Sequence, residues 1–208
     1  MQAIESETLI LYHTDLRGEW PEAAASGFAA RLPYARRVVA GADRETRRAS
    51  LAGVALALQA LAQLMGRAVP AGELVFERGE KPRLAPGPDG PGPDGASPDF
   101  SISHSGPWVG CAVVGRGQVG FDVELGTDER RAQWVVREAL IKATGEGLHA
   151  LEDTRALAPT PTGVCWRGVW WHLARLAIFS DATACVASSR PLRTVEARFS
   201  ALGELFAP

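Results

Sequence analysis

The sequence predicts an α+β fold of two lobes, and three observations support this. Strand-like, helix-like and strand-like segments occur in that order in each half of the 208 residues. One long Ala- and Leu-rich run repeats its apolar residues every three and four positions, which is the helical period. Several β-rich segments lie close together between glycine-containing turns. We expect an N-terminal lobe over residues 1–117 and a C-terminal lobe over 118–208, each a small, largely antiparallel sheet packed on a helix.

The first lobe is predicted from four segments. β-Forming residues at 8–12 predict an opening strand. The apolar run that starts near Asp43 predicts a helix that ends at Gly66. Residues 73–77 predict a short strand. Residues 85–98 contain a doubled Gly-Pro-Asp-Gly-like unit, which forms neither helix nor central strand and therefore predicts a surface loop.

The second half contains more strand than helix. The β-rich segments that predict a three-strand meander are residues 100–103, 109–114 and 118–125. The remaining predicted elements are a helix at 134–144 and a closing strand pair at 170–179 and 183–188. The acidic segment discussed below lies on the third strand of the meander.

The composition argues against several classes of partner. With 22 Lys and Arg against 24 Asp and Glu, the net charge is −2, so no global field favours nucleic acid or an anionic membrane. Three cysteines without paired spacing, Cys111, Cys165 and Cys185, indicate buried thiols in a reducing compartment. Residues 1–16 lack the basic start and long apolar run of a signal peptide, and we expect no membrane span. These features predict a cytoplasmic protein with no nucleic-acid and no membrane partner.

The most informative segment is Val-Gly-Phe-Asp-Val-Glu at residues 119–124. A strand places residues i and i+2 on one face, so Asp122 and Glu124 project together while Phe121 and Val123 turn to the other side. Two close carboxylates disfavour joint ionisation unless water or a cation surrounds them. The pair therefore indicates either an exposed strand end or a site for a hard divalent ion such as Mg²⁺, which binds carboxylate and phosphate oxygens.

A second group of residues follows on the predicted helix. Trp134, Glu138 and Lys142 are spaced four apart and share one helical face. An isolated Glu–Lys pair at this spacing is an ordinary feature of solvated helices. Here a large aromatic residue precedes the pair by one turn and apolar residues surround it, which favours a functional site for phosphate chemistry.

Four motifs occur in a fixed order along residues 79–148. They are Gly-Glu-Lys-Pro-Arg-Leu at 79–84, Phe-Ser-Ile-Ser-His-Ser at 100–105, the acidic segment at 119–124, and the helix at 134–144 with its Gly-Glu-Gly-Leu end. In this combination the chain resembles the 4'-phosphopantetheinyl transferases of the two-lobed Sfp type. The resemblance implies two pseudo-symmetric α/β lobes with coenzyme A in the cleft between them. It also implies transfer of the phosphopantetheine arm to a serine of an acyl or peptidyl carrier protein.

The resemblance assigns roles to the acidic residues. Asp122, Glu124 and Glu138 would bind Mg²⁺ together with the coenzyme A pyrophosphate. Glu138 would also accept the proton of the carrier serine, directly or through water. Lys142 would stabilise the leaving phosphate. These residues are the expected metal ligands and catalytic groups.

The coenzyme A contacts implied by the resemblance are Lys81, Pro82, Ser103, His104, Arg48 and Lys142. His104 would bind the pyrophosphate, and the Lys81-Pro82 pair would border the adenine or its ribose phosphate. Arg48, or equally Arg47, would lie near the 3'-phosphate. The wider cluster of arginines between residues 31 and 48 either faces such a polyanion or forms a solvated helix face.

Two departures from the family pattern leave the function open. The segment between Glu124 and Glu138 is markedly shorter than in the family, where it carries a helix that helps to dock the carrier. Arg137 stands where the family has lysine, and the two cations are not interchangeable at a phosphate site. The chain is therefore an active transferase with a trimmed docking surface, a non-catalytic homologue that binds coenzyme A or a carrier or acts as a scaffold in a biosynthetic complex, or an unrelated α+β binding domain. The retained acids and Lys142 favour the transferase, and we expect a monomer.

Overall fold

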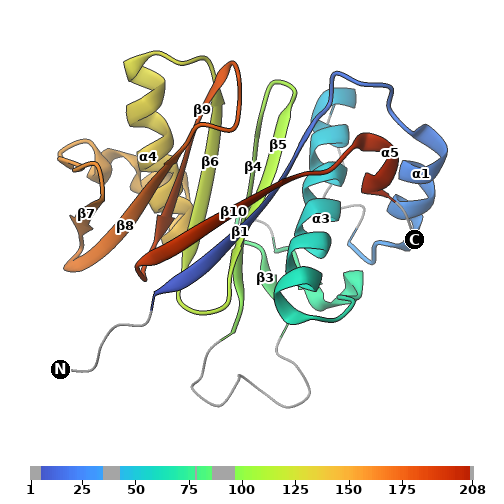
Figure 1. Ribbon diagram of the computed structural model, residues 1–208, viewed down its shortest axis with the longest axis horizontal. Helices are drawn as coiled ribbons and strands as arrows, with labels where there is room; N and C mark the ends of the chain where they lie inside the picture. The colour runs from blue at the N-terminus through green and yellow to red at the C-terminus, as the bar shows by residue number, and fades with distance from the viewer. Residues whose placement is uncertain (1–5, 35–42, 78, 86–96, 207–208) are drawn as a thin grey trace.

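The computed structural model describes residues 6–34, 43–77, 79–85 and 97–206 and contains both helices and sheets (Figure 1). The elements are β1 (Glu7–Asp15), α1 (Glu22–Arg31), α3 (Arg44–Met65), the 3₁₀ turn η1 (Ala71–Glu73), β2 (Leu74–Val75), β3 (Arg83–Leu84), β4 (Asp99–Ser105), β5 (Trp108–Val114), β6 (Val119–Leu125), α4 (Glu129–Thr144), the 3₁₀ segment η2 (Leu148–Thr154), β7 (Gly163–Trp166), β8 (Val169–Leu176), β9 (Ala182–Ser188), β10 (Leu192–Phe199) and α5 (Leu202–Leu205). One four-stranded sheet has the order β10-β1-β5-β4, the other has the order β6-β9-β8-β7, and β2 pairs with β3. The predicted α+β class is confirmed. Most of the loop predicted at residues 85–98 lies outside the described residues.

Helix α3 covers the first sheet. It starts at Asp43, whose carboxylate accepts a hydrogen bond from the Thr46 N–H at 2.9 Å. It ends at Gly66, which takes the left-handed conformation with φ 64° that a glycine C-cap provides. Its apolar face, including the fully buried Leu56 and Leu61, forms the core of this half together with the sheet. The helix predicted between Asp43 and Gly66 is therefore confirmed.

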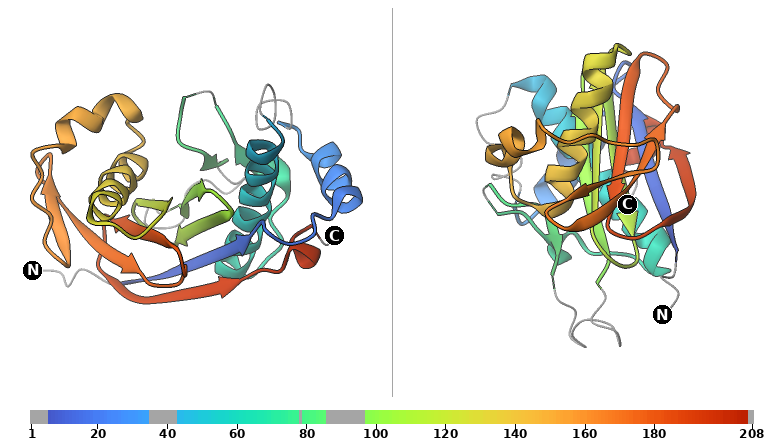
Figure 2. Two further views of the ribbon diagram at one scale, coloured as in Figure 1. Left: turned by 90° about the horizontal axis from the view of Figure 1, so that it is seen from above. Right: turned by 90° about the vertical axis from the view of Figure 1, so that its left-hand side faces the viewer.

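Helix α4 covers the second sheet. The Asp128 carboxylate caps it by accepting the Arg131 N–H at 3.1 Å, and Gly145 ends it with φ 74°. Val136 and Leu140 are fully buried in the core beneath it. The predicted helix is confirmed. It begins at Glu129, before the predicted start at residue 134, because the first turn is polar and exposed and so lacks the apolar residues that mark a helix in the sequence. Figure 2 shows α3 and α4 on the same side of the two sheets.

A third core lies between the two sheets. It joins Leu9 and Leu11 of β1 to Phe121 and Val123 of β6 and to Val186 of β9. Strands β1, β5, β6 and β9 are therefore covered on one face by a helix and on the other by this third core. Burial on both faces explains why β5 is apolar along its whole length.

The connectivity corrects two expectations. Strands β4 and β5 pair antiparallel as predicted, but β6 pairs with β9, so the three-strand meander is wrong at its third strand. Strand β10 pairs in parallel with β1, and α5 packs against the first core. Residues 192–205 therefore return to the first sheet, which departs from the division at residue 118. Local β-propensity could not reveal this, since β10 is an exposed edge strand with no apolar alternation.

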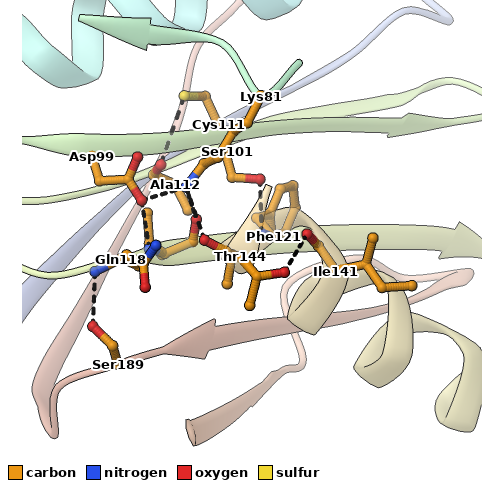
Figure 3. Close-up of polar contacts among 12 residues, drawn as sticks. Lys81, Asp99, Ser101, Cys111, Ala112, Gln118, Phe121, Ile141, Thr144 and Ser189 are labelled. Carbon is orange, nitrogen blue, oxygen red and sulfur yellow. Dashed lines mark hydrogen bonds and ion pairs between the residues drawn. The ribbon is translucent and has the colours of Figure 1, made fainter. Parts of the chain in front are cut away.

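Strands β4 and β6 are facing edge strands that are joined by side chains. Along β4, Asp99, Ser101, Ser103 and Ser105 accept the backbone N–H groups of Val119, Phe121, Val123 and Leu125, at 2.7, 3.0, 3.4 and 3.1 Å respectively. Figure 3 shows one of these contacts, between Ser101 and Phe121. An edge strand with unpaired N–H groups is unfavourable when buried, and the side-chain oxygens satisfy these groups. We call this contact the β4–β6 seam.

One expectation drawn from composition is wrong, and another stays a prediction. Among the residues that the structure describes, α3 has the length and apolar composition of a membrane span, a test that a buried core helix also passes, so the expected absence of a membrane span stays a prediction. In the protein its apolar side chains instead form the core of the first half. All three cysteines are free, and Cys111 and Cys185 are buried, but Cys165 is exposed because it lies on the outward face of the edge strand β7.

Candidate functional site

The acidic pair on β6 lies beside the seam, and its two side chains share one face, as the strand alternation predicts. Phe121 and Val123 face the core between the sheets, and Asp122 and Glu124 face the other way. The Asp122 carboxylate is 3 % exposed, and its Oδ1 accepts hydrogen bonds from Ser103 Oγ at 2.8 Å and from Lys142 Nζ at 2.6 Å. Burial raises the pKa of Asp122 above its ordinary value, and the Lys142 ammonium offsets this only in part.

Glu138 brings a second buried carboxyl group to the same place. It lies on α4 and is 7 % exposed, and no described residue hydrogen-bonds to its Oε1. Burial raises the pKa of Glu138, and the negative charges of Asp122 and Glu124 add to the effect against the opposing charge of Lys142. A carboxyl group with a raised pKa and a free oxygen is suited to accept a proton near neutral pH.

The residues fit a cation only in part. Within the described ranges, no three His, Cys, Asp or Glu side chains form a group ready to hold a metal ion, and Lys142 supplies the positive charge next to Asp122. Two buried oxygens nevertheless lack a hydrogen-bond partner among the described residues, Asp122 Oδ2 and Glu138 Oε1. Unpaired carboxylate oxygens are the ligands that a hard cation prefers. Glu124 is half-buried, and its Oε2 accepts the Ser105 hydroxyl at 2.9 Å.

Gly120 sets the distance between the strand and the helix that carry these groups. A Cβ atom at this position would lie 1.8 Å from Ala139 O and 2.4 Å from Ala143 N, both backbone atoms of α4. Only glycine permits that approach. The glycine of the acidic motif therefore brings Glu138 and Lys142 within reach of the β6 carboxylates.

Lys81 is engaged inside the protein rather than free for a ligand. Its ammonium group forms an ion pair with Asp99 and donates hydrogen bonds to Val119 O at 2.8 Å and Ala143 O at 3.5 Å. Figure 3 shows this lysine above Asp99 at the end of the seam. Burial lowers the pKa of Lys81, against the opposing effect of Asp99. Lys81 thus ties the β2–β3 hairpin to β4, β6 and α4.

The expected coenzyme A contacts divide between two pockets, except for Ser103, which lines neither of them. A pocket of about 210 Å³ is lined by Lys81, Pro82, Glu138 and Lys142, among other residues. A larger pocket of about 640 Å³ is lined by His104 and Arg48 together with residues from the β4–β5 turn and α3. His104 is exposed at its edge, and the partial burial of its imidazole and the Lys142 charge lower its pKa against the opposing charges of Asp122 and Glu124.

The structure distinguishes the two candidate arginines. Arg48 lines the larger pocket with His104, stacks its guanidinium 5.1 Å from the centre of the Trp20 ring and pairs with Glu22 at 3.6 Å. Arg47 is exposed and does not line that pocket. Arg36 and Arg37 of the same cluster lie outside the described residues. Arg48 is therefore the better placed of the two to meet a phosphate.

Sequence reasoning missed the other members of the seam. Asp99, Ser101 and Ser105 were not singled out. The signal that could have found them is the alternation of polar residues along β4, which places these side chains on one face of the strand. Their partners are backbone amides about twenty positions away, which no local motif predicts. Trp108 and Asp181, joined at 2.6 Å near the larger pocket, were missed because the two residues are distant in sequence.

Comparisons with known proteins do not add a relative. No protein-family model matches the sequence, and no curated protein matches it significantly. The function must therefore be inferred from the geometry of Asp122, Glu138 and Lys142 and from the motifs that carry them.

Proposed function

We propose that this chain transfers the 4'-phosphopantetheine arm of coenzyme A to a serine hydroxyl of an acyl or peptidyl carrier protein. The observation that carries the proposal is the convergence of Asp122 and Glu138, both buried and each with an unpartnered oxygen, on Lys142. Perturbed titratable groups at a pocket are typical of catalytic sites. The arrangement of one helix on each sheet supports two lobes with a cleft between them, and the pseudo-symmetry of these lobes is part of the proposal.

The roles follow from the chemistry of each group. Glu138 accepts the proton of the attacking serine, because its raised pKa makes it a better base than an exposed glutamate. The serine oxygen bonds to the β-phosphorus of coenzyme A, and the bond to the bridging oxygen breaks. Lys142 stabilises the negative charge on the 3',5'-bisphosphoadenosine that leaves.

Asp122, Glu124 and Glu138 are the residues that would hold Mg²⁺. When bound, this ion would neutralise charge on the pyrophosphate. Asp122 Oδ2 and Glu138 Oε1 are buried and unpaired, which supports this assignment. His104 and Arg48, in the larger pocket, bind the phosphates of coenzyme A, and Pro82 borders the adenine.

A second candidate function is non-catalytic binding of coenzyme A or of a carrier. The observation that favours it is the short connection from β6 to α4, in which only residues 126–128 separate the two elements. No element between them is available to dock a carrier. Exposed Trp134 and Leu125 are the apolar side chains that flank this connection.

The test is incubation with coenzyme A, Mg²⁺ and a panel of apo carrier proteins, followed by intact mass measurement. We expect a carrier to gain the phosphopantetheine mass, and we expect Asp122→Ala and Glu138→Gln to abolish the gain. Glu129→Gln, which alters an exposed acid on the same helix, serves as the matched control and should transfer normally. Mg²⁺-dependent coenzyme A binding without transfer would support the binding protein, and absence of coenzyme A binding would exclude both functions.

A further inference from the structure

The seam has a second set of contacts that involves the acidic pair. Ser103 accepts the Val123 N–H and donates its own proton to Asp122 Oδ1, the residue before Val123. Ser105 repeats the pattern one step along, accepting the Leu125 N–H and donating to Glu124 Oε2. Each hydroxyl therefore holds one backbone amide and one carboxylate of β6 at the same time.

The first serine of the series lacks the second contact. Ser101 accepts the Phe121 N–H at 3.0 Å, but the residue before Phe121 is Gly120, which has no side chain. The Ser101 hydroxyl therefore contributes to the seam but holds no β6 carboxylate. This difference separates the structural contribution of a seam serine from any effect on a carboxylate.

The hydroxyl of Ser103 fixes which oxygen of Asp122 stays free. Oδ1 accepts both Ser103 and Lys142, whereas Oδ2 is buried without a partner among the described residues. Ser103 also accepts a hydrogen bond from Lys142 Nζ at 2.8 Å, so it orients the lysine together with the acid. A hydrogen bond that holds one carboxylate oxygen limits rotation of the group and presents the other.

We propose that Ser103 and Ser105 are positioning residues through which the first sheet orients the carboxylates of the second. The candidate site would then be assembled across the seam, and displacement of β4 from β6 would release both acids. This inference rests on the proposed function for the use of the site, since Asp122 and Glu124 are expected there to bind a divalent ion. The orientation itself is independent of that ion.

The experiment compares Ser101→Ala, Ser103→Ala and Ser105→Ala in the full chain with two measurements. The first is the side-chain carboxyl ¹³C chemical shift of Asp122 and Glu124 in the metal-free protein. We expect Ser103→Ala to shift the Asp122 signal, Ser105→Ala to shift the Glu124 signal, and Ser101→Ala to shift neither. Amide hydrogen exchange at Phe121, measured alongside, should accelerate in Ser101→Ala and show that this variant does open the seam.

The second measurement is the affinity for Mn²⁺, followed by water-proton relaxation as a probe for Mg²⁺. Loss of a residue that orients a metal ligand typically weakens metal binding by about 10- to 100-fold. We expect about a tenfold loss for Ser103→Ala and Ser105→Ala and less than a twofold change for Ser101→Ala. Ser105→Thr, which keeps the hydroxyl at a half-buried position, should restore both the Glu124 signal and the affinity.

The outcomes separate this inference from the proposed function. Equal effects of all three alanine variants on the carboxyl signals, or unchanged signals in Ser103→Ala and Ser105→Ala, would overturn the positioning role. If the unaltered protein binds no Mn²⁺, the proposed metal site fails, and the carboxyl signals still decide whether the serines orient the acids. If Ser103→Ala does not fold, the comparison of Ser105→Ala with Ser105→Thr decides whether the serines orient the acids.

Discussion

Helices α3 and α4 each rest on a sheet beside a glycine, but they approach the sheet in different ways. At Gly53 of α3, an added Cβ would meet the Ile102 side chain, with its Cγ2 at 2.6 Å. At Gly120 of β6, an added Cβ would meet the backbone of α4, at 1.8 Å from Ala139 O. A side chain can turn aside, whereas a helix backbone must move as a whole. The contact at Gly120 therefore fixes the distance between β6 and α4. The contact at Gly53 only fills the space beside the Ile102 side chain.

The buried faces of α3 and α4 also differ in the types of residue they contain. The buried residues of α3 are apolar or glycine, whereas the buried face of α4 includes Glu138 with an unpaired oxygen. A buried polar atom without a partner lowers stability by about 1–3 kcal/mol. Both helices bury apolar residues, but only α4 also buries a carboxyl group, Glu138, with an oxygen that no described residue contacts. The proposed function would account for this loss of stability, since active sites commonly give up stability for activity.

The largest expected effect is that of Gly120→Ala. Because the new methyl group overlaps the α4 backbone, we expect the free energy of unfolding to fall by more than about 4 kcal/mol, in the range of severe substitutions. Urea denaturation monitored by circular dichroism measures it. Gly53→Ala is the matched control. There the better helix propensity of alanine offsets the displacement of Ile102, so we expect a change below about 1 kcal/mol. Similar losses at both positions would remove the distinction between the helices.

The second prediction concerns the lysine that ties α4 to the seam. Lys81→Met leaves Asp99 without its cation in a largely buried place, so we expect a loss of about 3 kcal/mol in the free energy of unfolding. Arg83→Met removes an exposed ion pair with Glu77 and should cost less than about 0.5 kcal/mol. Equal effects in urea denaturation would show that Lys81 does not anchor α4.

The third prediction tests whether the first turns of α3 contribute to coenzyme A binding. Arg48→Ala should weaken coenzyme A binding about tenfold, because a charge-assisted hydrogen bond to a phosphate is lost. Arg47→Ala, one position away and outside the larger pocket, should change the dissociation constant less than twofold. Isothermal titration calorimetry measures both. If Arg47→Ala shows the larger effect, the larger pocket is not the phosphate site.

The smallest predicted effect is a gain in stability. Glu138 has a raised pKa in the folded protein, so the folded state holds this proton more tightly than the unfolded state does. Stability linked to the protonated group is present at low pH and is lost as pH rises through the raised pKa. Glu138→Gln, which stays neutral, should therefore raise stability by about 1 kcal/mol at pH 7.5, or roughly 2–4 °C, and show little difference at pH 4. Thermal unfolding in EDTA at both pH values tests this. If Glu138→Gln is less stable than the unaltered protein at pH 7.5, burial of the ionised Glu138 carboxylate does not lower stability, and the prediction is wrong.

Local patterns predicted much of the fold. The capped and glycine-terminated helices α3 and α4, and the strands β4, β5, β6, β8 and β9, were recognisable because their signals lie within a few residues. Strand β10 and the partner of β6 were not, because pairing over long sequence distances is decided by packing rather than by propensity. The same contrast holds within the site. The alternation of Asp122 and Glu124 with apolar residues was visible, whereas the engagement of Lys81 by Asp99 was not.

The sequence by itself determined which groups are charged, which strand and helix carry them, and that Asp122 and Glu124 share a face, because these properties depend on residue type and on the periods of strand and helix. Only the tertiary structure decided that β4 and β6 meet edge to edge, that Lys142 takes the place next to Asp122, and that Arg48 rather than Arg47 lines the pocket of His104. Those contacts depend on how the two sheets pack against each other. The physical reason is that burial and long-range pairing arise only when distant segments come together. They determine the pKa shifts and which buried oxygens keep no hydrogen-bond partner.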